Sequence, residues 1–192
     1  LQWARANGCP WGTCTCHKAA EGGHLEMLLW ARKNGCPCDE NELHIAAQNG
    51  HEAMVRALIE LGAVVNKAMD NGVTPLYVAA QNGHEAIVRA LIEAGAGVNK
   101  AMDNGATPLL IAAPNGHEAI VRALIEAGAG VNKARDDGAT PLLIAAQRGH
   151  EAVVRALIEA DADVSKARAD GVMPLYMAAQ KGHTAIVQIL RD

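Results

Sequence analysis

The chain has 192 residues, of which half are hydrophobic, yet it contains no Phe and only 3% aromatic residues. Its core must therefore be aliphatic, which favours layers of helix packed on helix over one bulky globular core. A formal net charge of −4 does not fit a nucleic-acid-binding surface, which would be basic and clustered, and no apolar run is long enough to span a membrane. We therefore expect neither a nucleic-acid nor a membrane partner.

The N-terminal residues 1–50 repeat with a period of 27 residues. Four pairs of residues recur at this distance: Trp3 and Trp30, Cys9 and Cys36, His17 and His44, His24 and His51. The chain begins at Leu1 within LQWARANG, a segment that aligns with LLWARKNG at 28–35. We therefore expect the sequence to be a piece of a longer array.

A longer unit of 33 residues fills the rest of the chain. Residues 72–104 read GVTPLYVAAQNGHEAIVRALIEAGAGVNKAMDN, and they are repeated with six changes at 105–137, again at 138–170, and in part from Gly171 onward. One unit of this size is too small to close a core, so neighbouring units must stack. The sequence thus predicts a solenoid.

The start of each unit predicts a first helix. Thr74 offers a capping hydroxyl, and Pro75 suits the first helical position, where its missing N–H is not needed. Asn82-Gly83 is typical of a helix end, because these residues tolerate the left-handed conformation. The same pattern recurs in each of the longer units.

A second helix is predicted from about His84 to Gly95, because its apolar residues fall on one stripe. The Asp-Asn-Gly sequence at 103–105 is then typical of a tight hairpin whose glycine needs a positive φ. The predicted unit is a helix, a turn, a second helix and a protruding β-hairpin tip.

The short units lack this tip. Aligning residues 38–41 with 65–74 leaves six residues unmatched, 67–72, and these form the tip. We therefore predict short units over 1–37 and standard units over 38–192. The junction between the two types lies inside a continuous stack, so the whole of 1–192 is expected to be a single array without a domain boundary.

The residues TPLYVAA and GHEAIVRALIEAGAGVN resemble the ankyrin repeat, whose pattern is T-P-L-H-x-A-A, then G-H, then G-A-D-V-N. The resemblance covers nearly the whole chain in phase, and it implies an all-α, ankyrin-type α-solenoid, monomeric, with short β-hairpin tips in its C-terminal units. The sequence departs from the family at the histidine of T-P-L-H. Only His17 and His44 keep it, while the other units have Tyr77, Leu110, Leu143 and Tyr176.

The resemblance implies a protein–protein interaction scaffold or adaptor, with the partner on a concave face lined by tips and first helices. On that side the copies change from neutral to charged toward the C-terminus, whereas Arg89, Arg122 and Arg155 on the back are unchanged. This pattern predicts a partner-binding surface of Arg135, Asp137, Arg148, Arg168, Asp170 and Lys181. Neutral drift at exposed sites also explains the pattern. Two alternative functions remain open: a structural spacer without a dedicated partner, and a targeting module of a fused enzyme.

The five cysteines all lie in the short units: Cys9, Cys14, Cys16, Cys36 and Cys38. They supply enough thiols for zinc, but the usual spacing of two or three intervening residues is absent. A disulfide between equivalent points of stacked units would have to span about 8–10 Å, beyond the reach of about 7 Å between Cα atoms. Buried, reduced thiols are therefore favoured, and they indicate a reducing, cytoplasmic location.

Catalytic signals are weak. The repeated His-Glu pairs lack the second His four residues on that a zinc protease helix needs, and Ser165 is the only serine. No Gly-rich phosphate-binding loop follows a predicted strand. We therefore expect no enzyme on this segment and no catalytic, cofactor or metal site.

Overall fold

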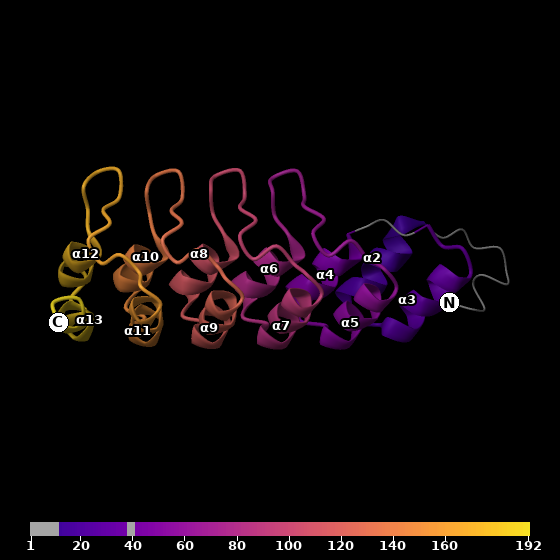
Figure 1. Cartoon of the computed structure of the whole chain (residues 1–192). Coiled ribbons are helices and arrows are strands. Elements are labelled where there is room, and N and C mark those ends of the chain that lie inside the picture. The colour runs from indigo at the N-terminus through magenta and orange to yellow at the C-terminus, as the bar shows by residue number, and fades with distance from the viewer. Residues whose placement is uncertain (1–11, 38–40) are drawn as a thin grey trace.

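The computed structural model describes residues 12–37 and 41–192, and these residues form a stack of helical pairs (Figure 1). The first helices of the pairs are α2 (Thr13–Glu21), α4 (Glu42–Asn49), α6 (Pro75–Asn82), α8 (Pro108–Ala112), α10 (Pro141–Arg148) and α12 (Pro174–Gln180). The second helices are α3 (Leu25–Lys33), α5 (Glu52–Glu60), α7 (Glu85–Glu93), α9 (Glu118–Glu126), α11 (Glu151–Glu159) and α13 (Thr184–Ile189). The all-helical solenoid predicted from the sequence is confirmed for this part of the chain.

The predicted helix starts and stops are also confirmed. Thr74 accepts a hydrogen bond from the backbone N–H of Tyr77 at 3.2 Å, and the equivalent bonds occur in α8 and α10. Gly83 ends α6 in the left-handed conformation with φ 80°. In the fourth copy Met173 replaces the threonine, and α12 has no side-chain cap. Local sequence therefore sets the boundaries of these helices.

The core is a continuous aliphatic layer between the two rows of helices. Leu76, Leu109 and Leu142 occupy the same position in successive units, and each is 1% exposed. Alanines face the neighbouring units and allow the helices to approach closely: Ala79, Ala80, Ala112, Ala113, Ala145 and Ala146 are all fully buried. Each unit is thus held mainly by its neighbours.

Four tips protrude from the standard units on the side of the first helices (Figure 1). We call them tip one (67–72), tip two (100–105), tip three (133–138) and tip four (166–171). Each is closed by two backbone hydrogen bonds, as from Met102 N–H to the Ala106 carbonyl and from Gly105 N–H to the Met102 carbonyl, both at 2.9 Å, and Gly105 has the predicted positive φ of 80°. These turn bonds do not make a ladder, and the described residues contain no β-strand. The β-structure predicted for the tips is therefore not confirmed.

Histidines at the starts of the second helices join each unit to the one before it. Nε2 of His84 lies 3.0 Å from the Gln48 carbonyl, and the same contact recurs in the other units at 2.8–3.3 Å. These histidines therefore form hydrogen bonds between successive units rather than caps within their own helices. In α4 His44 keeps the family position, and its Nε2 lies 3.1 Å from the Val73 carbonyl.

Pro114 shortens the helix in which it lies. Helix α8 stops at Ala112 and continues as a 3₁₀ turn over Ala113–Asn115, whereas α6 and α10 run on for eight residues. Proline has no N–H for the last turn, and its ring crowds the carbonyl four residues earlier. We expect Pro114→Gln to extend α8 and stabilise the protein by about 1 kcal/mol, a fraction of the ~3 kcal/mol of a mid-helix proline. Thermal melts followed by circular dichroism test this, and an unchanged or lower melting temperature would contradict it.

Asp161 is the one non-glycine residue with positive φ in the described part of the chain, at 61°. Glycine holds the equivalent position in the preceding units, as at Gly95 and Gly128, with φ 83° and 85°. We expect Asp161→Gly to stabilise the protein by about 0.5–1 kcal/mol, because glycine adopts this conformation without a Cβ penalty. Denaturant unfolding measures the change. Clear destabilisation would show that the Asp161 carboxylate stabilises the turn.

Candidate functional site

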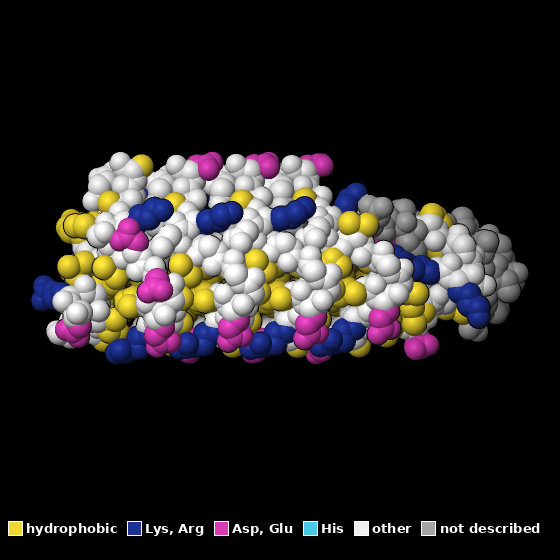
Figure 2. All heavy atoms as spheres, in the orientation of Figure 1, with side chains coloured by type: hydrophobic (Ala, Val, Ile, Leu, Met, Phe, Trp, Pro, Cys, Tyr) yellow, Lys and Arg dark blue, Asp and Glu magenta, His cyan; other side chains and the backbone are white. Residues whose placement is uncertain are grey.

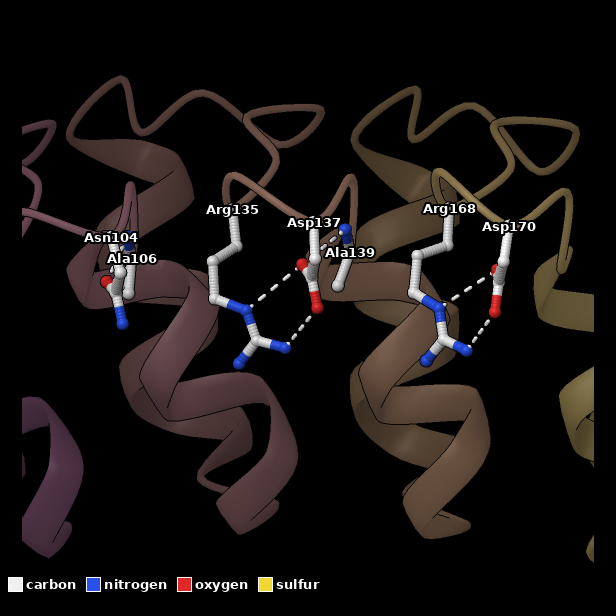
Figure 3. A network of polar contacts seen from close by, with 7 residues as sticks. All are labelled: Asn104, Ala106, Arg135, Asp137, Ala139, Arg168 and Asp170. Carbon is white, nitrogen blue, oxygen red and sulfur yellow. Dashed lines mark hydrogen bonds and ion pairs between the residues drawn. The ribbon is translucent and has the colours of Figure 1, made fainter.

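Two Arg–Asp pairs lie side by side on tips three and four (Figure 3). Arg135 donates to Asp137 through Nε, at 3.1 Å, and through Nη2, at 2.5 Å. Arg168 makes the same two contacts with Asp170, its Nε lying 3.0 Å from Oδ1. Each guanidinium is therefore fixed by a bidentate ion pair within its own tip.

The acidic residues of these pairs also build the turn. Oδ1 of Asp137 accepts the Ala139 N–H at 3.0 Å, and in tip two Asn104 accepts the Ala106 N–H at the same distance (Figure 3). Asparagine and aspartate thus close the turn in the same way. The change from Asn to Asp toward the C-terminus keeps the tip and adds a charge that holds the new arginine.

The Arg135–Asp137 pair predicts an unusual titration. The hydrogen bond from Arg135 lowers the pKa of the Asp137 carboxyl to about 2, although desolvation opposes the shift. A lowered pKa means that the pair contributes stability above the ordinary carboxyl pKa of 3.8, and that this contribution is lost as the pH falls toward 2. The contribution is small, because both side chains are about 40% exposed. We expect carbon-13 NMR to give a midpoint near 2 for wild type and a return toward 3.8 in Arg135→Met. A wild-type midpoint near 3.8 would contradict the pairing.

Arg148 and Lys181 lie apart from these pairs. Arg148 ends α10 and Lys181 follows α12, so the two cations occupy equivalent places in adjacent units. Both are exposed, and neither forms an ion pair with another described residue. Tip three leads into the N-terminus of α10, and eight helical residues therefore separate it from Arg148 by about 12 Å. The predicted site residues thus form two rows along the first-helix side of the stack.

The back of the stack is different, because its arginines are paired. Arg89 and Arg155 each bond the glutamate four residues earlier on the same helix, both at 2.9 Å. Arg122 does so too, and it also reaches Glu159 of the next unit at 2.8 Å. Figure 2 shows these acidic and basic side chains gathered along the edge formed by the second helices. The unpaired cations of the C-terminal units therefore lie on the opposite side.

One prediction about the cysteines is wrong. Cys16 is buried, as predicted, but it is disulfide-bonded rather than a free thiol. The sequence argument excluded only pairs at equivalent positions of stacked units, and this does not cover pairs at shifted positions. Cys36 is free and buried, as predicted, whereas Cys14 is free but exposed, so the prediction of burial is also wrong for Cys14. Cys9 and Cys38 lie outside the described residues. The inference of a reducing location from free thiols therefore does not hold for Cys16.

The described residues contain neither a membrane-spanning helix nor a cluster of metal-binding side chains. None of their helices is long and apolar enough to cross a membrane. Within 12–37 and 41–192, no group of three or more His, Cys, Asp or Glu side chains could hold a metal ion.

Sequence reasoning missed a groove where the short and standard units meet. It has a volume of about 760 Å³ and is lined by His17, Asn41, Ile45 and residues 67–70. The absence of a tip from the short units was the signal that could have located it.

Comparison with known families identifies the repeat. A family model described as ankyrin repeats in three copies matches residues 16–102, 43–137 and 109–192. Together these overlapping matches extend from residue 16 to the last residue of the sequence. No curated protein matches the chain.

Proposed function

Because the chain belongs to the ankyrin repeat family, we propose that it is a protein–protein interaction scaffold that binds its partner on the concave, first-helix side. The proposed surface consists of Arg135, Asp137, Arg148, Arg168, Asp170 and Lys181. One observation carries this choice. Copies that are otherwise nearly identical acquire charges at these tip and helix-end positions, while the back keeps Arg89, Arg122 and Arg155 in the three full copies and has Gln188 in the fourth.

The charge of this surface favours an acidic partner. Its four cations and two carboxylates give 4 − 2 = +2, on a chain whose formal net charge is −4. A local positive surface on an acidic protein steers encounter and excludes wrong partners more than it adds affinity. We expect the partner to present carboxylates to Arg148 and Lys181, the two cations without an ion pair among the described residues.

The Arg–Asp pairs add rigidity to the proposed surface. Each bidentate ion pair uses Nε and Nη2 of its arginine, so the N–H groups of Nη1 remain available to donate to a partner. A side chain already held in one geometry loses less conformational entropy when a partner binds. Arg135 and Arg168 would therefore act as fixed hydrogen-bond donors.

Paired charge reversals test this proposal. Arg148→Glu with Lys181→Glu changes the front, and Arg89→Glu with Arg155→Glu changes the back by the same charge. Arg122 is left alone, because its bond to Glu159 links two units. We expect the back variant, Arg89→Glu with Arg155→Glu, to capture the same proteins from a lysate as wild type. The front variant, Arg148→Glu with Lys181→Glu, should no longer capture them. Loss from the back pair with retention by the front pair would contradict the assignment, and capture of nothing by wild type would favour a spacer.

A further inference from the structure

Adjacent tips are joined by their backbones. The Asp103 N–H of tip two donates to the Asn71 carbonyl of tip one at 3.3 Å, and two further bonds of this kind join tips two and three and tips three and four. The contact is close, because a Cβ at Gly72 would lie 2.9 Å from the Cα of Met102. Each tip therefore offers a backbone N–H and a flat backbone surface to the tip that precedes it.

Tip one has no preceding tip, because the short units lack these residues. The row of tips begins beside α6, and no described residue continues it beside α4 (Figure 1). By repeat position the Asp70 N–H corresponds to that of Asp103, but within the described residues it has no acceptor. Met69 is 38% exposed, whereas Met102, which tip one covers, is half-buried. Within residues 12–37 and 41–192, the surface that would receive a tip is thus left open.

The groove at the junction of short and standard units lies against this open surface. We call it the junction groove; it is lined by His17, Asn41, Ile45 and residues 67–70. A second hollow of about 380 Å³ shares His17 and Ile45 with it and extends between α2 and α4. The two hollows therefore lie next to each other along α2 and α4.

We propose that the junction groove binds a tight-turn segment of a partner protein in the place of the missing tip. The segment would present a backbone carbonyl to the Asp70 N–H and lay an apolar side chain on Ile45 and Met69. A glycine would follow the pairing carbonyl, because at Gly72 a side chain would collide with the next tip. This inference relies on the proposed role as an interaction scaffold but not on the charged surface of tips three and four.

The probe is a backbone-cyclised peptide with the sequence of residues 65–73, VNKAMDNGV. It carries the turn that makes this contact within the stack. In amide NMR spectra of the full chain we expect the peptide to shift the Asp70 resonance and to leave that of Asp103, whose N–H is already bonded, unchanged. A peptide with alanine in place of its glycine is the control ligand and should not bind.

Asp70→Pro removes the donor and keeps the turn. The Gly72 N–H donates to the Met69 carbonyl at 2.9 Å, which closes a four-residue turn. Neither Asp70 nor Asn71 has a positive φ, so the turn is of type I. Asp70 is its second residue, a position at which proline is favoured. We expect Asp70→Pro to melt at the wild-type temperature and to bind the peptide at least fivefold more weakly. Asp103→Pro should lower the melting temperature, because its N–H bonds tip one.

Absence of an Asp70 shift at millimolar peptide, or equal affinity of Asp70→Pro, would overturn the proposal. The Arg148→Glu, Lys181→Glu protein should bind the peptide as wild type does, because its changes lie at the other end of the stack (Figure 1). If the peptide fails to bind while the Arg148→Glu, Lys181→Glu protein still loses the captured partner, the proposal for the junction groove is wrong and the proposed function stands. If the peptide binds and the Arg148→Glu, Lys181→Glu protein still captures the partner, the assignment of partner binding to the charged surface is wrong.

Discussion

Replacing Gly138 with alanine is expected to lower the free energy of unfolding by about 2–5 kcal/mol. Gly138 has φ 84°, a conformation that costs an L-residue about 1–2 kcal/mol. A Cβ there would also lie 2.8 Å from the backbone nitrogen of Ala169 in tip four, and this atom belongs to the bond that joins the two tips. Relieving the overlap must move one tip relative to the other, which adds about 1–3 kcal/mol.

Gly171→Ala is the matched control for this change. Gly171 has nearly the same φ, 82°, but no atom lies within 4 Å of a Cβ placed there. We expect it to cost only the conformational term, about 1–2 kcal/mol. Urea denaturation of both variants measures the difference between them. Equal destabilisation would show that contact between tips contributes nothing to stability.

Replacing Asn99 with alanine is expected to cost about 2–3 kcal/mol. Its amide bridges two units, because Nδ2 donates to the Gly128 carbonyl at 2.9 Å and Oδ1 accepts the Gly130 N–H at 2.8 Å. Each bond contributes about 0.5–1.5 kcal/mol, and the partly buried Gly130 N–H would be left without an acceptor. The same bridge recurs at Asn66 and Asn132.

Asn82→Ala serves as the control for Asn99→Ala. The Asn82 side chain bonds only the Val78 carbonyl of its own helix, at 2.9 Å. We expect a change within about 0.5 kcal/mol, as for other surface positions. Denaturant unfolding of the two variants compares a bond between units with a bond within a helix. A similar cost for both would mean that the asparagine bridges do not hold the stack together.

Much of the fold could be predicted because its signals are local. Thr74 and Pro75 start α6 and Gly83 ends it through contacts within a few residues. The 33-residue period then implied stacking, and the leucines at equivalent positions are buried as this requires. Pro114 likewise breaks its helix where local sterics predict.

Contacts between units were harder to predict from the sequence. Asn99 bonds groups 29 and 31 residues away, and no local pattern distinguishes it from a loop asparagine. The sequence predicted the burial of Cys16 but not its disulfide bond. In the candidate site the charges were found from their variation, but the pairing of Arg135 with Asp137 depends on the shape of the turn.

Amide hydrogen exchange of a complex with any captured partner tests the binding surface most directly. We expect slower exchange in tips three and four and in α10 and α12, with unchanged exchange in α7, α9 and α11. Slower exchange along the second helices α7, α9 and α11, with unchanged exchange in the tips, would contradict it.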